Sequence, residues 1–210
     1  MLEGIRTDEQ KKLIVTEGRL DPVSEYLSRL SDMILRMPRE QIYEVIQVLY
    51  EAWELGQRIF VCGNGGSAAN ASHLVNDLSK LTIVEGQPRF KVIGLTDNVA
   101  LMTAWSNDTE YENVYAEQLR NLVEPGDVVI GISASGNSPN ILRTMEVAHE
   151  NQVIRVGLTG ASGGRLKELV DYCIMIPDEH IGRQEDGHMI VNHIIANTLR
   201  WMITEGANQV

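Results

Sequence analysis

Residues 127–139 read DVVIGISASGNSP, and this stretch decides the fold of the chain. Its first half, Asp127–Ile132, is a short apolar run after the turn dipeptide Pro125-Gly126, which predicts a buried strand. The stretch then carries three serines, and Pro139 suits the first position of a helix capped by Ser138. A buried strand, a glycine/serine loop and a helix therefore follow one another.

The loop Ser133–Ser138 is a candidate phosphate site. Backbone N–H groups and the positive end of the helix dipole face such a loop, and serine hydroxyls can turn toward phosphate oxygens. No lysine takes part in the pattern, so it does not predict a Walker-type nucleotide loop. A serine-rich capping turn without a ligand is the alternative interpretation of this loop alone.

A second loop has the same construction. The apolar run Arg58–Cys62 predicts a strand, Gly63–Ser67 follows it, and an alanine-rich helix is expected from about Ala68 to Lys80. Loops at the carboxyl ends of parallel strands meet at one edge of an open sheet, where ligands bind. We therefore expect two helix N-termini to face one ligand.

The same loop also matches a dinucleotide-binding pattern. Gly63–Ala68 satisfies G-x-G-x-x-A, which is a weak signal by itself. The acidic residue that this reading requires, Asp97, comes late, behind a long insertion at Thr82–Arg89. A nicotinamide oxidoreductase would also leave Ser133–Ser138 without a role.

Alternating strands and helices predict the fold class. Five apolar runs are separated by helical segments, which predicts an α/β protein with a doubly wound, mostly parallel five-stranded sheet. The expected strands are Arg58–Cys62, Lys91–Leu95, Asp127–Ile132, Val153–Leu158 and Tyr172–Ile176.

Two helices are expected ahead of the sheet. One begins at Asp21-Pro22 and ends at Pro38, and the second runs through Ile42–Trp53 to Gly56, so that they form an N-terminal helical hairpin. Residues 1–20 are polar and mixed in charge. We expect residues 1–210 to form a single domain, in which residues 1–56 are a helical segment used in oligomerisation.

Charge and cysteine content restrict the class of protein. Eighteen basic and 29 acidic residues give a net charge of −11, and no Lys/Arg cluster interrupts it, which argues against direct nucleic-acid or membrane binding. Cys62 and Cys173 lie in apolar strand patterns typical of reduced thiols. The sequence has no secretory signal and no apolar run near 18 residues, so a cytoplasmic location is expected.

Histidines and carboxylates suggest a metal site. His73 and Asp77 are four residues apart on one helix, which puts both on the same face. The polar segment Arg183–His188 is expected to precede the last helix, in which His193 follows. Nitrogen and oxygen ligands favour zinc. A helix-stabilising His–Asp contact without metal is the alternative.

Four motifs, taken in order and spacing, resemble a known family. They are Gly63–Ser67, Thr96–Asn98, Asn107-Asp108 and Ser133–Ser138. From about residue 22 to the C-terminus the chain resembles the sugar isomerase (SIS) domain, specifically the phosphoheptose isomerase family. The resemblance implies a flavodoxin-like three-layer sandwich and a homotetramer. A sister branch with the same motifs is a replication-initiation factor that binds the initiator DnaA.

The resemblance also implies metal ligands, one zinc ion per subunit being expected. Aligned on the histidines, the family's ligands fall on His73, Asp77, Glu185 and His193. Asp77 stands where the family has glutamate, and Glu185 where it has glutamine; Gln184 would take that role only if the register shifted by one. The family's arginine falls at Leu81.

The implied reaction is aldose–ketose isomerisation of a sugar phosphate, most specifically of sedoheptulose 7-phosphate through an enediol. Asp77 is assigned as the base, His193 as the acid and Glu185 as the reserve base. The remaining residues assigned to the substrate are Asn64, Gly65, Ser67, Asp97, Ser133, Ala134, Ser135 and Ser138. A non-catalytic, DnaA-binding regulatory module is the alternative, although its branch does not keep a histidine at the position of His193.

Overall fold

The computed structural model describes residues 21–207 of the chain. They divide into two compact units, which end and begin at Met37 and Pro38, and each unit is considered by itself. The expected features of residues 1–20 lie outside the described residues.

The first unit contains one described helix, α2 (Pro22–Leu35). The carboxylate of Asp21 accepts hydrogen bonds from the N–H groups of Val23 and Ser24, and Pro22 occupies the first turn, as predicted. Four apolar side chains of this helix are exposed, namely Val23, Leu27, Ile34 and Leu35, whereas Met33 is buried.

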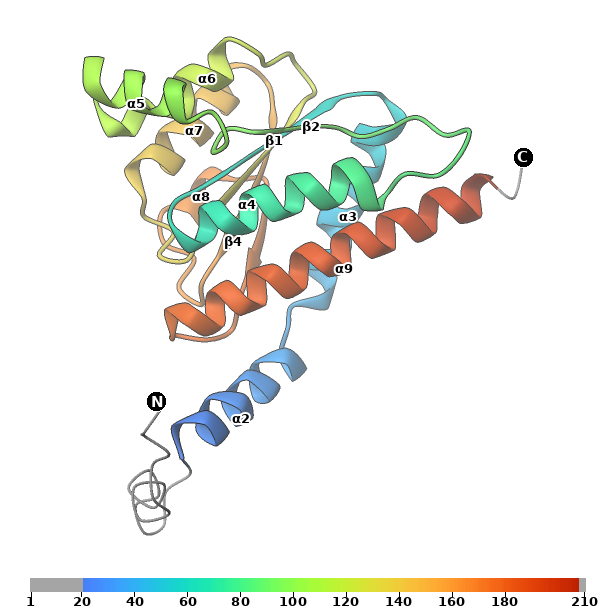
Figure 1. Cartoon of the computed structure of the whole chain (residues 1–210), viewed down its shortest axis with the longest axis vertical. Helices are drawn as coiled ribbons and strands as arrows, with labels where there is room; N and C mark the ends of the chain where they lie inside the picture. The colour runs from blue at the N-terminus through green and yellow to red at the C-terminus, as the bar shows by residue number, and fades with distance from the viewer. Residues whose placement is uncertain (1–20, 208–210) are drawn as a thin grey trace, which may run out of the picture. The chain divides into compact units, whose positions relative to one another are not determined.

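The second unit is built on a five-stranded, entirely parallel sheet, which confirms the predicted fold class. The strands lie in the order β2-β1-β3-β4-β5 (Figure 1). Their bounds are β1 (Arg58–Gly63), β2 (Lys91–Gly94), β3 (Val128–Ser133), β4 (Ile154–Thr159) and β5 (Tyr172–Met175). Ile59 pairs with Val128, and Cys62 pairs with Gly131, so β1 and β3 end side by side.

Helices cover both faces of this sheet (Figure 1). On one face α9 contacts both α3 and α4, and on the other α7 contacts β3, β4, α6 and α8. The helices of this unit are α3 (Arg39–Glu54), α4 (Gly66–Asn76), α5 (Val99–Asp108), α6 (Ala116–Arg120), α7 (Pro139–Glu150), α8 (Leu166–Leu169) and α9 (Ile181–Ala207). A π-helical turn, η2 (Asp77–Leu81), follows α4, and a 3₁₀ turn, η3 (Tyr111–Asn113), follows α5.

The helix α3 belongs to the core of the second unit. It contacts β1, β5 and α9 and buries Val45, Ile46 and Leu49. Gly56 has φ +67° just after it, which is the left-handed ending that the sequence predicted. Because α3 packs on the sheet, only residues up to Met37 form a separate N-terminal unit, and the predicted pairing of α2 with α3 stays a prediction.

Two helix bounds differ from the prediction. The helix that was expected to run to Lys80 ends at Asn76, where the backbone changes to the π-helical turn. The segment Arg183–His188 lies inside α9, which begins at Ile181, instead of preceding it. No helix within residues 21–207 is long and apolar enough to cross a membrane.

Candidate active site

The two predicted loops lie at the point in the sheet where the strand order reverses, between β1 and β3. β2 lies on one side of β1 and β3 on the other, so the carboxyl ends of β1 and β3 flank the crevice in which open α/β sheets bind ligands. At Gly63 a Cβ would lie 2.4 Å from the backbone oxygen of Ser67, so only glycine fits there. Gly65 has φ +55° and caps α4, and Ser67 is buried in the first turn.

The loop after β3 brings the hydroxyls of Ser133 and Ser138 together. Ser138 is the N-cap of α7, but its side chain makes no capping bond; its Oγ lies 3.1 Å from Oγ of Ser133. Gly136 has φ +63°, and the N–H of Asn137 donates to Oγ of Ser135. A pair of hydroxyls beside an uncapped helix N-terminus offers several donors to an anion.

The loop after β4 supports the serine loop, a contact that sequence reasoning missed. The N–H of Gly160 donates to the carbonyl of Ala134, and the N–H of Arg165 donates to Oδ1 of Asn137. The two loops can approach this closely because Gly136 has no side chain: a Cβ there would lie 2.1 Å from the carbonyl oxygen of Gly163. The closely spaced glycines Gly160, Gly163 and Gly164 were the available signal.

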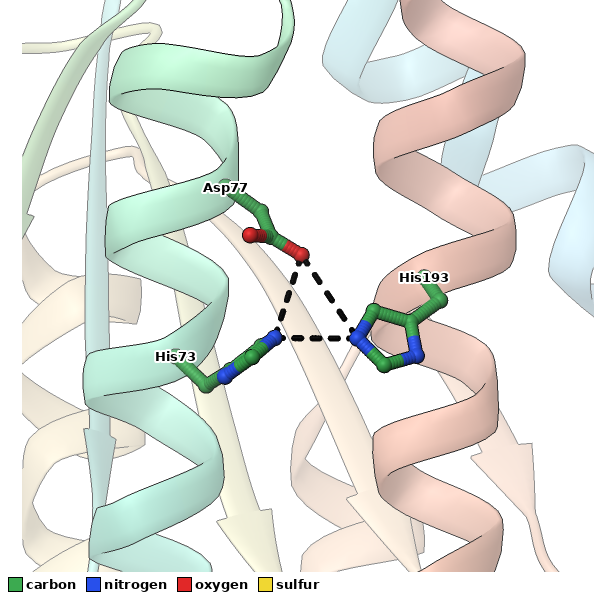
Figure 2. Close-up of side chains that lie close together, drawn as sticks. All are labelled: His73, Asp77 and His193. Atoms are coloured by element: carbon green, nitrogen blue, oxygen red, sulfur yellow. Dashed lines mark hydrogen bonds and ion pairs between the residues drawn. The ribbon is translucent and has the colours of Figure 1, made fainter.

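Three ionisable side chains converge between α4 and α9. Figure 2 shows His73 and Asp77, at the end of α4, pointing toward His193 on α9. The Nε2 atoms of the two histidines are 3.0 Å apart, and Oδ2 of Asp77 lies 3.3 Å from His73 Nε2 and 3.9 Å from His193 Nε2. His193 is more than a hundred positions from His73 and Asp77 in the sequence, and the contact of α4 with α9 brings it to them.

This cluster fits a metal ion. Its three donor atoms lie within 4.8 Å of one another. A tetrahedral zinc site with bonds near 2.0–2.1 Å separates its ligand atoms by about 3.3 Å, which falls inside the observed range of separations. Oδ2 of Asp77 is buried and accepts no hydrogen bond from the described residues, so a strong acceptor is left to bind a cation.

Glu185 does not join this cluster. Its carboxylate packs against Gly66, where a Cβ would lie 2.2 Å from Oε1, and its backbone carbonyl accepts a bond from Asn70. Eight residues of α9, or about 12 Å of helix, separate it from His193. Within one chain the structure therefore brings together three of the four predicted ligands.

Gln184 is held in another place. Its Nε2 donates to the carbonyl of Asp178 at 2.7 Å, and the side chain is buried against Gly160. The one-residue register shift that would make Gln184 the fourth ligand is therefore not seen.

The first turn of α9 is fixed by a second ion pair. The guanidinium of Arg183 donates to both carboxylate oxygens of Asp178, at 2.8 and 2.9 Å. These bonds hold the pKa of Asp178 below its ordinary value. The pair sets where α9 begins, and with it the position of Glu185.

Asp97 lies in the loop after β2 and faces α4. Its Oδ1 accepts from Oγ of Ser72 at 2.6 Å and from Oγ1 of Thr96 at 3.2 Å. The hydroxyl of Ser72 lies one residue before His73. Asp97 thus joins the β2 loop to the helix that carries two of the three clustered residues.

Asn64 lies directly after β1 in a network that the sequence did not predict. Its Oδ1 accepts from the hydroxyl of Tyr111 at 3.1 Å and from Nδ2 of Asn140 at 2.9 Å. Tyr111 also lines a cavity of about 430 Å³, together with Met102, Thr103, Ser106 and Asn107.

A fully buried histidine lies on α9 outside the cluster. Nε2 of His188 lies 3.2 Å from the carbonyl oxygen of Thr159, and its Nδ1 has no partner among the described residues. Burial lowers the pKa of His188 to about 4, so the ring is neutral at pH 7.

Comparison with known proteins assigns the chain to a family. Residues 24–160 match the SIS domain. The chain is 38% identical over 154 residues to phosphoheptose isomerase of Aneurinibacillus thermoaerophilus, covering 73% of this chain and 77% of that protein. It is 41% identical over 145 residues to phosphoheptose isomerase 2 of Campylobacter jejuni, covering 69% and 72%.

A solved structure agrees with these relatives. Phosphoheptose isomerase from Neisseria gonorrhoeae superimposes with a TM-score of 0.79 at 26% identity, covering 84% of this chain and 96% of that one. The glycine and serine loops, the α4–α9 cluster and these similarities lead to one conclusion: the chain belongs to the phosphoheptose isomerase family of SIS-domain proteins.

Proposed function

We propose that this protein is an aldose–ketose isomerase that converts sedoheptulose 7-phosphate to an aldoheptose 7-phosphate. The observation that carries the proposal is the convergence of His73, Asp77 and His193 on a fold whose serine loop suits a phosphate. The family relationship supports the same reaction class.

The phosphate belongs on the loop Ser133–Ser138. Its hydroxyls, the backbone of Ala134 and the N-terminus of α7 offer donors. The N-terminus of α4 is less suited to a second anion, because the carboxylate of Glu185 already lies against Gly66. The serine loop is therefore the favoured of the two loops for the phosphate of the substrate.

The sugar hydroxyls would meet the groups between this loop and the cluster. Donors and acceptors of the right kind are Asn64, the backbone of Gly65, Ser67, Asp97 and Glu185. The oxygen of Asn64 is engaged with Tyr111 and Asn140, which leaves one of its N–H groups for substrate.

His73, Asp77 and His193 are the residues that would hold one zinc ion per subunit. Zinc would supply Lewis-acid stabilisation of the negative charge that develops on the sugar oxygens in the enediol. Glu185 would reach the same ion only from another chain or after movement, because its own chain holds it at Gly66.

The chain's own groups would move the proton. Asp77 removes a proton from C1 of the ketose, and the electron pair of that C–H bond forms the enediol double bond while the C2 carbonyl oxygen gains a proton. Loss of the proton from the C1 hydroxyl and protonation of C2 then give the aldose, so no external oxidant is needed. His193 is assigned to the proton transfers between oxygens, and Glu185 is the reserve base.

The proposal extends to assembly and location. Apolar side chains on α2 are exposed in the single chain, which supports their use between subunits of a homotetramer.

Cys62 and Cys173 are free thiols, and burial raises the pKa of Cys62 to about 12, as suits an unreactive thiol in the cytoplasm. The DnaA-binding alternative gains no support, because it would give the clustered histidines no role.

The proposal is tested by incubating the protein with sedoheptulose 7-phosphate and a panel of other ketose phosphates, with and without zinc. We expect an aldoheptose 7-phosphate as the product of the first substrate. No product from any member of the panel would overturn the proposed function and favour the regulatory alternative.

A further inference from the structure

Two amide side chains join the loops at the carboxyl ends of β1 and β3. Asn64 follows β1, and Asn140 lies in the first turn of α7, where it is only 2% exposed. Nδ2 of Asn64 donates to Oδ1 of Asn140 at 2.8 Å, and Nδ2 of Asn140 donates to Oδ1 of Asn64 at 2.9 Å. The two side chains thus form a reciprocal pair.

Neighbouring donors fix the orientation of both amides. The backbone N–H of Ile141 donates to Oδ1 of Asn140 at 3.0 Å, and the hydroxyl of Tyr111 donates to Oδ1 of Asn64 at 3.1 Å. Turning either amide over would set donors against donors and acceptors against acceptors. Each amide therefore has one favourable orientation, and the pair links the loop after β1 to the first turn of α7.

This link lies between the two halves of the proposed active site. Asn64 precedes Gly65, which caps α4, and α4 leads to His73 and Asp77. Asn140 comes two residues after Ser138, the end of the serine loop. The pair therefore sets how far the proton-transfer groups lie from the phosphate anchor.

We propose that Asn140 is a positioning residue for the isomerisation, acting through Asn64 to hold the serine loop in register with α4. The proposal rests on the function proposed above. A substrate anchored by its phosphate presents its reacting carbons at a fixed distance, and a misplacement near 1 Å can cost about 100-fold in rate.

The test replaces Asn140 and compares the result with a matched control. Asn140→Ala removes the link. Asn140→Ser also removes it but keeps an oxygen that can accept from the N–H of Ile141. The serine variant therefore serves as the test if the alanine variant does not fold. Thr144→Ala is the control: Oγ1 of Thr144 donates to the carbonyl of Asn140 at 2.7 Å, so the variant loses a buried hydrogen bond of the same helix but keeps the amide pair.

We expect both Asn140 variants to lower kcat about 10- to 100-fold, with KM, inorganic phosphate affinity and zinc content within about threefold of the unmodified protein. Thr144→Ala should keep its kcat. In a double-mutant cycle, adding Asn140→Ala to Asn64→Ala should change kcat less than about threefold, because the first change already breaks the pair.

Two results would overturn the proposal while leaving the proposed function standing. One is an Asn140 variant with the kcat of Thr144→Ala, and the other is fully multiplicative loss of kcat in the cycle. Failure of the unmodified protein to isomerise any sugar phosphate would overturn the proposed function and this proposal together.

Discussion

Asp77 is one methylene shorter than the glutamate that the family resemblance implies, yet its Oδ2 lies within 3.9 Å of both histidine Nε2 atoms. The residue stands where α4 passes into the π-helical turn η2, and such turns are often found at functional sites. Arg200 of α9 donates to the carbonyl of Leu81 at the end of that turn. An arginine thus contacts the position where the family resemblance implied one, but it comes from another helix.

Metal content is the first property we predict at this scale. The purified protein should contain about one zinc ion per subunit, and His73→Ala or His193→Ala alone should lose it, because two remaining ligands bind zinc poorly. Elemental analysis gives the answer, with His149→Ala on the exposed end of α7 as the control. Equal zinc in the three variants would contradict the assignment of the cluster.

His188 gives a prediction for pH. Its pKa is lowered in the folded chain to about 4, while an unfolded histidine has a pKa of about 6.5, so the unfolded state binds more protons between these values. Stability supplied by the neutral ring is therefore complete above about pH 6.5 and is lost as pH falls toward 4. From the pKa difference this amounts to about 3 kcal/mol.

The variant His188→Gln isolates this effect, because a neutral amide can donate to the carbonyl of Thr159 without titrating. Urea unfolding between pH 7 and 4 should show a smaller loss of unfolding free energy in the variant than in the unmodified protein. Parallel curves for the two proteins would show that His188 does not contribute to acid sensitivity.

Individual site residues were predictable to different degrees. His73 and Asp77 share a helix face by simple periodicity, and the family alignment supplied His193. The position of Glu185 could not be foreseen, because it depends on Gly66 leaving room for a carboxylate and on where α9 begins. Asn140 and Tyr111 carry no local pattern; only the fold brings them to Asn64.

At the scale of elements, buried strands were the most predictable feature. Each expected strand agrees with the structure to within about one residue, because an apolar run between turn residues has few other interpretations. The start of α9 was misplaced, since the polar run Arg183–His188 and its glycine suggested a loop. In the folded chain Gly187 packs against Ile176, which explains a glycine inside the helix.

The serine loop makes an element-scale prediction. Replacing Ser135 and Ser138 together by alanine should weaken sugar-phosphate binding by roughly 1–3 kcal/mol, the scale of a few lost hydrogen bonds. The fold should persist, because backbone bonds from Gly136 and Gly160 maintain the loop. Calorimetry would measure the affinity, with Ser28→Ala on α2 as the control; unchanged binding in the loop variant would refute the assignment.

At the scale of the whole molecule, the sheet order explains why the two loops meet. The arrangement β2-β1-β3-β4-β5 puts the ends of β1 and β3 together. The apolar pattern predicted a doubly wound sheet without its strand order, and the observed order is that of the flavodoxin-like sandwich that the family resemblance implies. How subunits associate lies beyond a single chain, and the expected tetramer remains a prediction.

That assembly can be tested through α2. Leu27 and Leu35 are 58% and 72% exposed, so Leu27→Glu with Leu35→Glu should leave each subunit folded. If α2 packs between subunits, the buried charges should dissociate the tetramer in analytical ultracentrifugation. Leu55→Glu, at a position 75% exposed on the other unit, is the control. A tetramer unaffected by the α2 changes would exclude this role.

The central claim is that this protein isomerises a sugar phosphate by moving a proton between adjacent carbons, with Asp77 as the base. The measurement is deuterium incorporation from D₂O during incubation with sedoheptulose 7-phosphate and zinc, followed by mass and NMR analysis of the sugars. Unmodified protein should place deuterium at C2 of the aldose. Asp77→Asn should lower kcat by about 10²- to 10⁴-fold, and Glu185→Gln should be tolerated. Near-normal turnover in Asp77→Asn beside an inactive Glu185→Gln would contradict the account.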